Sequence, residues 1–237
     1  MLAGAAPRTA LAIAPHAAAA CGESVQDIIN TALIAEQLAT TFYYTGLTSR
    51  AVMSDARTAG SSGDPNAVAG DGDPRNVAFL QAALDQEQKH AQILATAGAA
   101  SSFKSFYFPA STFEELGYTS KVGTYLWVLD HLETAFIGAY LSAANRFGVL
   151  GRPDLAVFAL RILAVECQHR ALYRVISRDD PADNVTLEVA DFSCVADAAG
   201  VLAPFLTGHG FPGAAGPAIP IPKPDETARA IGKNTSS

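Results

Sequence analysis

Two Glu-x-x-His motifs are the residues of this chain best suited to chemistry. They are Glu87–His90, which reads EQKH, and Glu166–His169, which reads ECQH. In an α-helix, residues i and i+3 project about 60° apart on one face, so a carboxylate and an imidazole can reach the same ion. Two further glutamates, Glu36 and Glu133, each lie in the middle of an apolar run.

These residue types together point to a pair of metal ions. A carboxylate on the apolar face of a helix is costly unless it is paired or bound to a metal. Two cations would offset the repulsion among four such carboxylates, and four Glu with two His are the ligands of a di-iron or di-manganese centre. One Glu from each of two helices plus two Glu-x-x-His motifs is the known pattern of di-metal carboxylate bundles. The predicted metal ligands are Glu36, Glu87, His90, Glu133, Glu166 and His169.

The elements that must position these residues are helices, because helical periodicity dominates and convincing strand alternation is absent. The pattern predicts helices over 24–47, 74–97, 121–147 and 153–178, and a fifth over 187–206. An aromatic-rich crossover, 99–120, joins the second helix to the third and is expected to lie against the bundle. The predicted fold is therefore all-α: a ferritin-like four-helix bundle with a long crossover between helices 2 and 3 and a fifth, C-terminal helix.

Both ends of the chain differ in composition from the bundle. The expected organisation is a leader or disordered segment over 1–22, a ferritin-like domain over 23–206 and a Pro/Gly-rich tail over 207–237, extended or disordered. The leader carries Arg8, an apolar stretch and four alanines before Cys21, which resembles an export signal ending in a bacterial lipoprotein cleavage site. It predicts an exported protein, either periplasmic or anchored to the envelope through Cys21. The alternative is an Ala-rich disordered leader on a cytoplasmic protein.

The composition and charge of the chain argue against some classes of partner. The net charge of −7 and the absence of a dense Lys/Arg stripe argue against nucleic acid. No apolar stretch is long enough to span a membrane, so the chain is not expected to be transmembrane. Three cysteines show no CxxC spacing, and Cys21 could pair with Cys194 only if the fold brings them together.

The two halves of the bundle correspond to each other in sequence. Aligning Glu36 with Glu133 places Tyr43 over Tyr140, and aligning the two Glu-x-x-His motifs superposes their histidines. Each tyrosine lies two turns from its glutamate, so it could donate a hydrogen bond near the metals or take part in electron transfer. An ordinary bundle aromatic with a satisfied hydroxyl is the alternative.

Three residues lie beside the predicted ligands in the sequence and are further candidates for a role at the site. Asp130 lies one turn before Glu133 and could orient a ligating histidine or be solvated. His131 is rotated away from Glu133 and is expected not to ligate. Cys167 is expected to be a buried, inert thiol.

At these residues the chain resembles the ferritin-like superfamily and, more narrowly, the bacterial ferritin-like domain group related to plant desiccation-related proteins. The resemblance covers roughly 23–206 and rests on the segments LIAEQLATTFYY, FYFPASTF, LETAFIGAYLSAA and AVECQHRALY. Many members of that group lack part of the ligand set. This chain keeps all six positions, which favours an occupied site.

Two functions are compatible with this interpretation. The first is a di-iron protein that reacts with O2 or peroxide, as an oxidase or oxygenase; a di-manganese, catalase-like protein would use nearly the same ligands. The second is a non-enzymatic, exported protein with a stress-protective or structural role, in which metal adds stability. The expected partners are two iron or two manganese ions, O2 or peroxide, and a second copy of the chain in a homodimer. No catalytic residue separate from the metal ligands is predicted.

Overall fold

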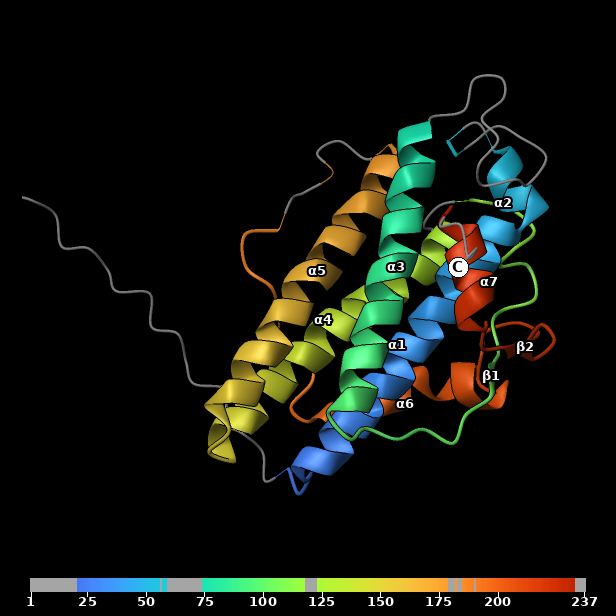
Figure 1. Ribbon diagram of the computed structural model, residues 1–237. Helices are drawn as coiled ribbons and strands as arrows, with labels where there is room; N and C mark the ends of the chain where they lie inside the picture. The colour runs from blue at the N-terminus through green and yellow to red at the C-terminus, as the bar shows by residue number, and fades with distance from the viewer. Residues whose placement is uncertain are drawn as a thin grey trace, which may run out of the picture.

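The computed structural model describes residues 21–55, 57–58, 74–117, 123–178, 182, 185–189 and 191–232. Its main feature is a bundle of four long helices (Figure 1). They are α1 (Val25–Thr48), α3 (Pro74–Thr96), α4 (Tyr125–Val149) and α5 (Pro153–Ser177). Helix α1 packs chiefly along α3, and α4 packs chiefly along α5, so the bundle consists of two helical pairs. The predicted all-α four-helix bundle is confirmed.

Local signals set the ends of these helices. Ser24 and Asp27 form a capping box at the start of α1: the Ser24 hydroxyl accepts from the Asp27 N–H (3.2 Å), and the Asp27 carboxylate accepts from the Ser24 N–H (2.9 Å). Pro153 occupies the first turn of α5, where its missing N–H costs nothing. Helix α4 begins at Tyr125 rather than at residue 121, because Gly123 has a φ of 88°, outside the helical range.

The crossover lies against the bundle, as expected from its aromatic residues. Its strand β1 (Ser105–Phe106) pairs antiparallel with β2 (Ile219–Pro220) near the C-terminus. Phe106 and Phe108 are buried, and the ring of Phe108 lies 5.7 Å from that of Phe42 on α1. A short helix, α2 (Arg50–Ser54), follows directly after α1.

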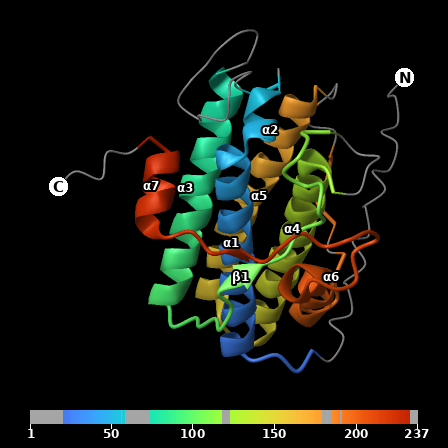
Figure 2. The same ribbon diagram turned by 90° about the vertical axis from the view of Figure 1, so that its right-hand side faces the viewer.

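Two C-terminal helices cover the outside of the bundle. Helix α6 (Val195–Thr207) is the predicted fifth helix; it begins at residue 195 rather than 187, where the Asp197 carboxylate accepts from the Cys194 N–H (3.0 Å). Figure 2 shows the chain crossing the face of α1 from the side of α6 to α7 (Pro224–Ala230), beside α3. Helix α7 lies in the segment expected to be extended or disordered. Seven residues are too few for a stable isolated helix, so α7 depends on its packing against α1 and α3.

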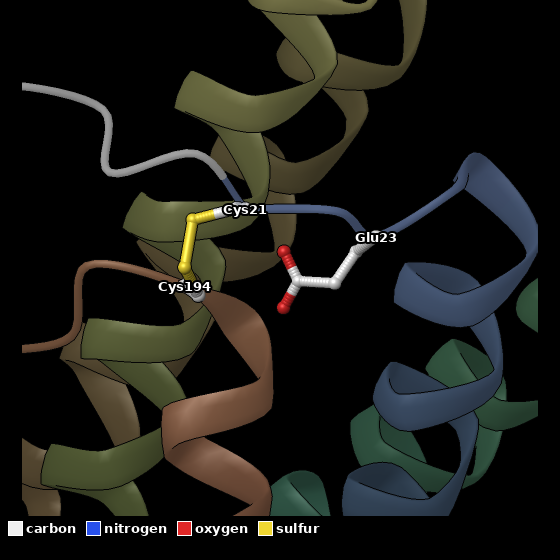
Figure 3. Close-up of side chains that lie close together, drawn as sticks. All are labelled: Cys21, Glu23 and Cys194. Carbon is white, nitrogen blue, oxygen red and sulfur yellow. A yellow bond between two sulfur atoms is a disulfide. The ribbon is translucent and has the colours of Figure 1, made fainter.

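The start of α1 is held to α6 and α4 by three interactions. Cys21 forms a disulfide with Cys194, directly before α6 (Figure 3). The Glu23 carboxylate accepts from the Ala196 N–H at the start of α6 (2.5 Å), and the Arg146 guanidinium on α4 donates to the Glu23 carbonyl (3.0 Å). The disulfide uses the sulfur to which a lipid anchor on Cys21 would be attached, so an anchored form would lack this bond. None of the helices in the described ranges is long and apolar enough to cross a membrane.

A close contact between α1 and α4 gives a test of the packing. A Cβ at Gly46 would lie 2.3 Å from Cε2 of Tyr125, whose ring is stacked on Phe42 at 4.6 Å and has little room to move. Gly46→Ala is therefore expected to lower the free energy of unfolding by roughly 1–3 kcal/mol, measured by denaturant unfolding. Gly200→Ala in α6 is the control: no atom lies within 4 Å of its Cβ, and a gain of about 0.5–1 kcal/mol is expected. Equal effects of the two substitutions would contradict the contact.

Candidate metal centre

The six predicted ligands meet in the interior of the bundle. Helix α1 supplies Glu36 and α4 supplies Glu133, whereas α3 and α5 each supply a Glu-x-x-His pair. The four glutamates and His169 are buried, and the side chain of His90 is 12% exposed. Because the helices are amphipathic with the apolar side inward, a residue on that side is carried into the core whatever its charge. The structure thus brings all six residues together.

The six side chains form two overlapping groups. In each group the candidate ligand atoms lie within 4.8 Å of one another. The first group is Glu36, Glu87, His90 and Glu166, and the second is Glu87, Glu133, Glu166 and His169. Glu87 and Glu166 belong to both. The arrangement therefore has two neighbouring positions for a cation, with two carboxylates shared between them and one carboxylate and one imidazole belonging to each.

Both histidines turn Nδ1 towards the carboxylates. In His169, Nδ1 lies 2.7 Å from Glu87 Oε1 and 3.1 Å from Glu166 Oε2. In His90, Nδ1 lies 3.2 Å from Glu36 Oε2 and 3.4 Å from Glu166 Oε1. Nδ1 is therefore the nitrogen that each ring would offer to an ion.

Several carboxylate oxygens at the centre have no hydrogen-bond partner. Within the described part of the chain, these buried atoms are both oxygens of Glu87, Oε2 of Glu133 and Oε1 of Glu166. Histidine nitrogens come near some of them, but without the alignment of a hydrogen bond. Buried oxygens are normally satisfied, and a set left open around one point is what cation ligands require. The residues present therefore fit a metal pair.

The carboxyl groups have perturbed pKa values. Burial, and then the charges of Glu166 and Glu36, raise the pKa of Glu87 well above its usual value. Burial likewise raises the pKa of Glu133 well above its usual value, against the lowering influence of the His169 charge. Burial alone would raise the pKa of Glu166, but the hydrogen bond from His169 and the close approach of His90 lower it to about 2. Without a cation, burial therefore favours the protonated forms of Glu87 and Glu133.

In the histidines, the neighbouring carboxylates rather than burial favour the protonated form. Burial alone would lower the pKa of His90, but its close contacts with the carboxylates of Glu166, Glu36 and Glu87 raise the value to about 12. The pKa of His169 is raised too, because the hydrogen bond to Glu166 and the charge of Glu133 outweigh burial. The carboxylates therefore favour positive charge among them, whether from protons on the histidines or from a cation.

A pair of tyrosines joins the two halves of the site. Tyr43 on α1 donates to Glu133 Oε1 on α4 (2.5 Å), and Tyr140 on α4 donates to Glu36 Oε1 on α1. Burial, followed by the charges of these glutamates, raises the pKa of both tyrosines well above the usual value. The structure therefore supports the interpretation of both tyrosines as hydrogen-bond donors, with each orienting the carboxylate that belongs to only one cation position.

Of the neighbouring residues weighed from sequence, none belongs to the cluster. Asp130 accepts a hydrogen bond from Tyr173, so it does not orient a ligating histidine; its side chain faces α5 one turn beyond His169. His131 is exposed and stacks on Trp127, with ring centroids 3.9 Å apart. The Cys167 thiol is free and half-buried rather than buried, and partial burial raises its pKa to about 11.

One residue near the histidines was missed from sequence. Oε1 of Gln86 lies 2.8 Å from Nε2 of His169. Gln86 directly precedes Glu87, but a half-exposed helical glutamine has no pattern that separates it from an ordinary surface residue. Only the approach of α3 to α5 reveals the contact.

Comparison with known proteins bears on the site as well as on the fold. The model of a family described as ferritin-like domain matches residues 24–178. The match includes the four long helices and all six residues of the cluster. A comparison with curated proteins and one with solved structures each found no match.

Proposed function

The chain belongs to the ferritin-like domain family, and from this premise we propose that its buried cluster holds two iron ions and reacts with O2 or peroxide. Glu36 and His90 would serve one ion, and Glu133 and His169 the other. Glu87 and Glu166 would serve both ions. The observation that carries the proposal is the set of buried carboxylate oxygens without hydrogen-bond partners, facing two histidine Nδ1 atoms.

The chemistry would be divided between the ions and the protein. An iron pair held by these residues would supply electrons for the reduction of O2 or peroxide. The shared carboxylates offset the positive charge, and the two tyrosines hold the outer carboxylates in place. Burial keeps bulk water from the glutamates. Oxygen and nitrogen ligands of this kind also suit manganese, so a di-manganese, catalase-like protein is the variant of the same proposal.

The redox function is tested by loading the metal-free protein with Fe(II) under anaerobic conditions and then adding air or peroxide. The wild type is expected to develop a near-ultraviolet absorption band. Glu87→Ala, which removes a shared carboxylate, is expected to develop none. Gln88→Ala, beside it on the same helix but outside the cluster, should behave as the wild type does. A wild-type spectrum that stays unchanged would refute the redox function.

A second function is favoured by the disulfide between Cys21 and Cys194. Such bonds persist in oxidising compartments, so we propose that the chain is exported. In that setting, a non-enzymatic protein with a protective or structural role would bind metal for stability, in keeping with the resemblance to bacterial relatives of the desiccation-related proteins. Ligand substitutions would then lower the melting temperature of the metal-loaded protein, and no turnover would accompany binding.

Metal binding is expected to tighten as pH rises. Glu87, Glu133, His90 and His169 all have raised pKa values, so the metal-free cluster favours their protonated forms. An ion must displace those protons, so binding releases them, and the affinity should increase about tenfold per pH unit for each proton released. Calorimetric titration at pH 6.5 and pH 8 measures the affinity at each pH. Repeating it in buffers of different ionisation enthalpy measures the number of protons released. Binding without proton release would contradict the assignment.

A further inference from the structure

The two histidines of the cluster differ in whether Nε2 of the ring has a hydrogen-bond partner. Nε2 of His169 lies 2.8 Å from Oε1 of Gln86, on the neighbouring helix. When Glu87 is aligned with Glu166, the residue that corresponds to Gln86 is Val165. A valine side chain has no hydrogen-bonding group, so the pseudo-two-fold symmetry of the ligands does not extend to the residues behind them.

The surroundings of His90 agree with this difference. Within the described part of the chain, the polar contacts of its ring all run through Nδ1, to Glu36, Glu87 and Glu166. Its side chain is 12% exposed, whereas that of His169 is 0% exposed. One imidazole is therefore held at both nitrogens and enclosed, and the other is held at one nitrogen and reaches solvent.

The contact with Gln86 determines which nitrogen of His169 is free to bind an ion. A neutral imidazole carries one proton, on Nδ1 or on Nε2. In the neutral ring, an Nε2–H that donates to Gln86 Oε1 leaves the lone pair on Nδ1, in the orientation in which it would bind an ion within the cluster. His90 has no such anchor, so binding an ion there must also order its ring.

We propose that Gln86 is a positioning residue that makes the Glu133/His169 position bind its ion more tightly and leaves the Glu36/His90 position as the exchangeable one. The inference rests on the proposed two-metal site. It assigns the two positions different tasks: a retained ion at the enclosed histidine, and an ion that enters and leaves beside the partly exposed one.

The test is a titration of the full-length, metal-free protein with Zn(II), a redox-inert probe, against a competing chelator. The wild type is expected to bind Zn(II) in two separate steps. Gln86→Leu should weaken the tighter step about 10–100-fold and leave the weaker step unchanged. Gln86→Glu, which keeps an oxygen acceptor at the same place, should retain the tight step. Val165→Leu is the matched control on the other side of the pseudo-symmetry and should change neither step.

Nitrogen-15 NMR of labelled histidine measures which ring nitrogen of His169 is protonated. A substitution that only loosened the packing would not change this. In the zinc-loaded wild type, His169 is expected to show a protonated Nε2 whose proton exchanges slowly, and Gln86→Leu should lose that protection. Equal weakening of both steps by Gln86→Leu, or the same loss in Val165→Leu, would overturn the inference while leaving the metal site intact. A wild type that takes up no Zn(II) would instead contradict the two-metal site itself, and the inference with it.

Discussion

Glu87→Ala is expected to abolish binding of both metal ions. Glu87 belongs to both groups of candidate ligands, so its loss removes a donor from each position and one of the charges that hold the two cations together. Elemental analysis of protein purified without chelators should find about two ions per chain in the wild type and almost none in the variant. Glu36→Ala removes a donor from one position only and is expected to retain about one ion.

Two controls separate this effect from a general loss of structure. Gln88→Ala, on the same helix but outside the cluster, is expected to keep both ions. Glu87→Gln keeps the size of the side chain and replaces a buried carboxyl group, whose pKa is raised, with an amide that carries no charge. Its metal-free form should therefore melt no lower than that of the wild type, whereas metal should no longer raise its melting temperature. Two ions retained in Glu87→Ala would show that Glu87 is not shared.

Removing the disulfide is expected to have the largest effect on stability of any change outside the bundle core. The bond joins cysteines 173 residues apart, so it restricts the unfolded chain strongly. Reduction, or the double substitution Cys21→Ala with Cys194→Ala, should lower the free energy of unfolding by about 2–5 kcal/mol. Denaturant unfolding with and without reductant measures the difference. Metal content should stay the same, because neither cysteine belongs to the glutamate–histidine cluster.

Cys167→Ala is the control for this experiment. Its thiol is free, so the substitution should leave the reductant-dependent change intact. Mass spectrometry after alkylation under denaturing conditions should find one reactive thiol in the wild type and three after reduction. Unfolding that does not respond to reductant would mean that the bond does not form in the folded protein.

The sequence by itself determined the helical bundle and the set of six residues that it encloses. Both follow from local periodicity: residues three apart share a face, and an apolar stripe carries whatever lies within it into the core. For that reason the sequence alone was enough to group Glu36 and Glu133, charged residues in apolar runs, with the two Glu-x-x-His motifs. The structure brings the six together, and their role as metal ligands stays a prediction.

Only the tertiary structure decided which residues distant in the chain meet. It placed Cys21 against Cys194, turned Asp130 towards Tyr173 and set Gln86 behind His169. It also placed Glu87 and Glu166 in both groups of candidate ligands, and it packed the seven-residue helix α7 against α1 and α3. The physical reason is the same in each case: periodicity specifies the face on which a side chain lies, whereas its partner depends on how the helices pack, which no local pattern records.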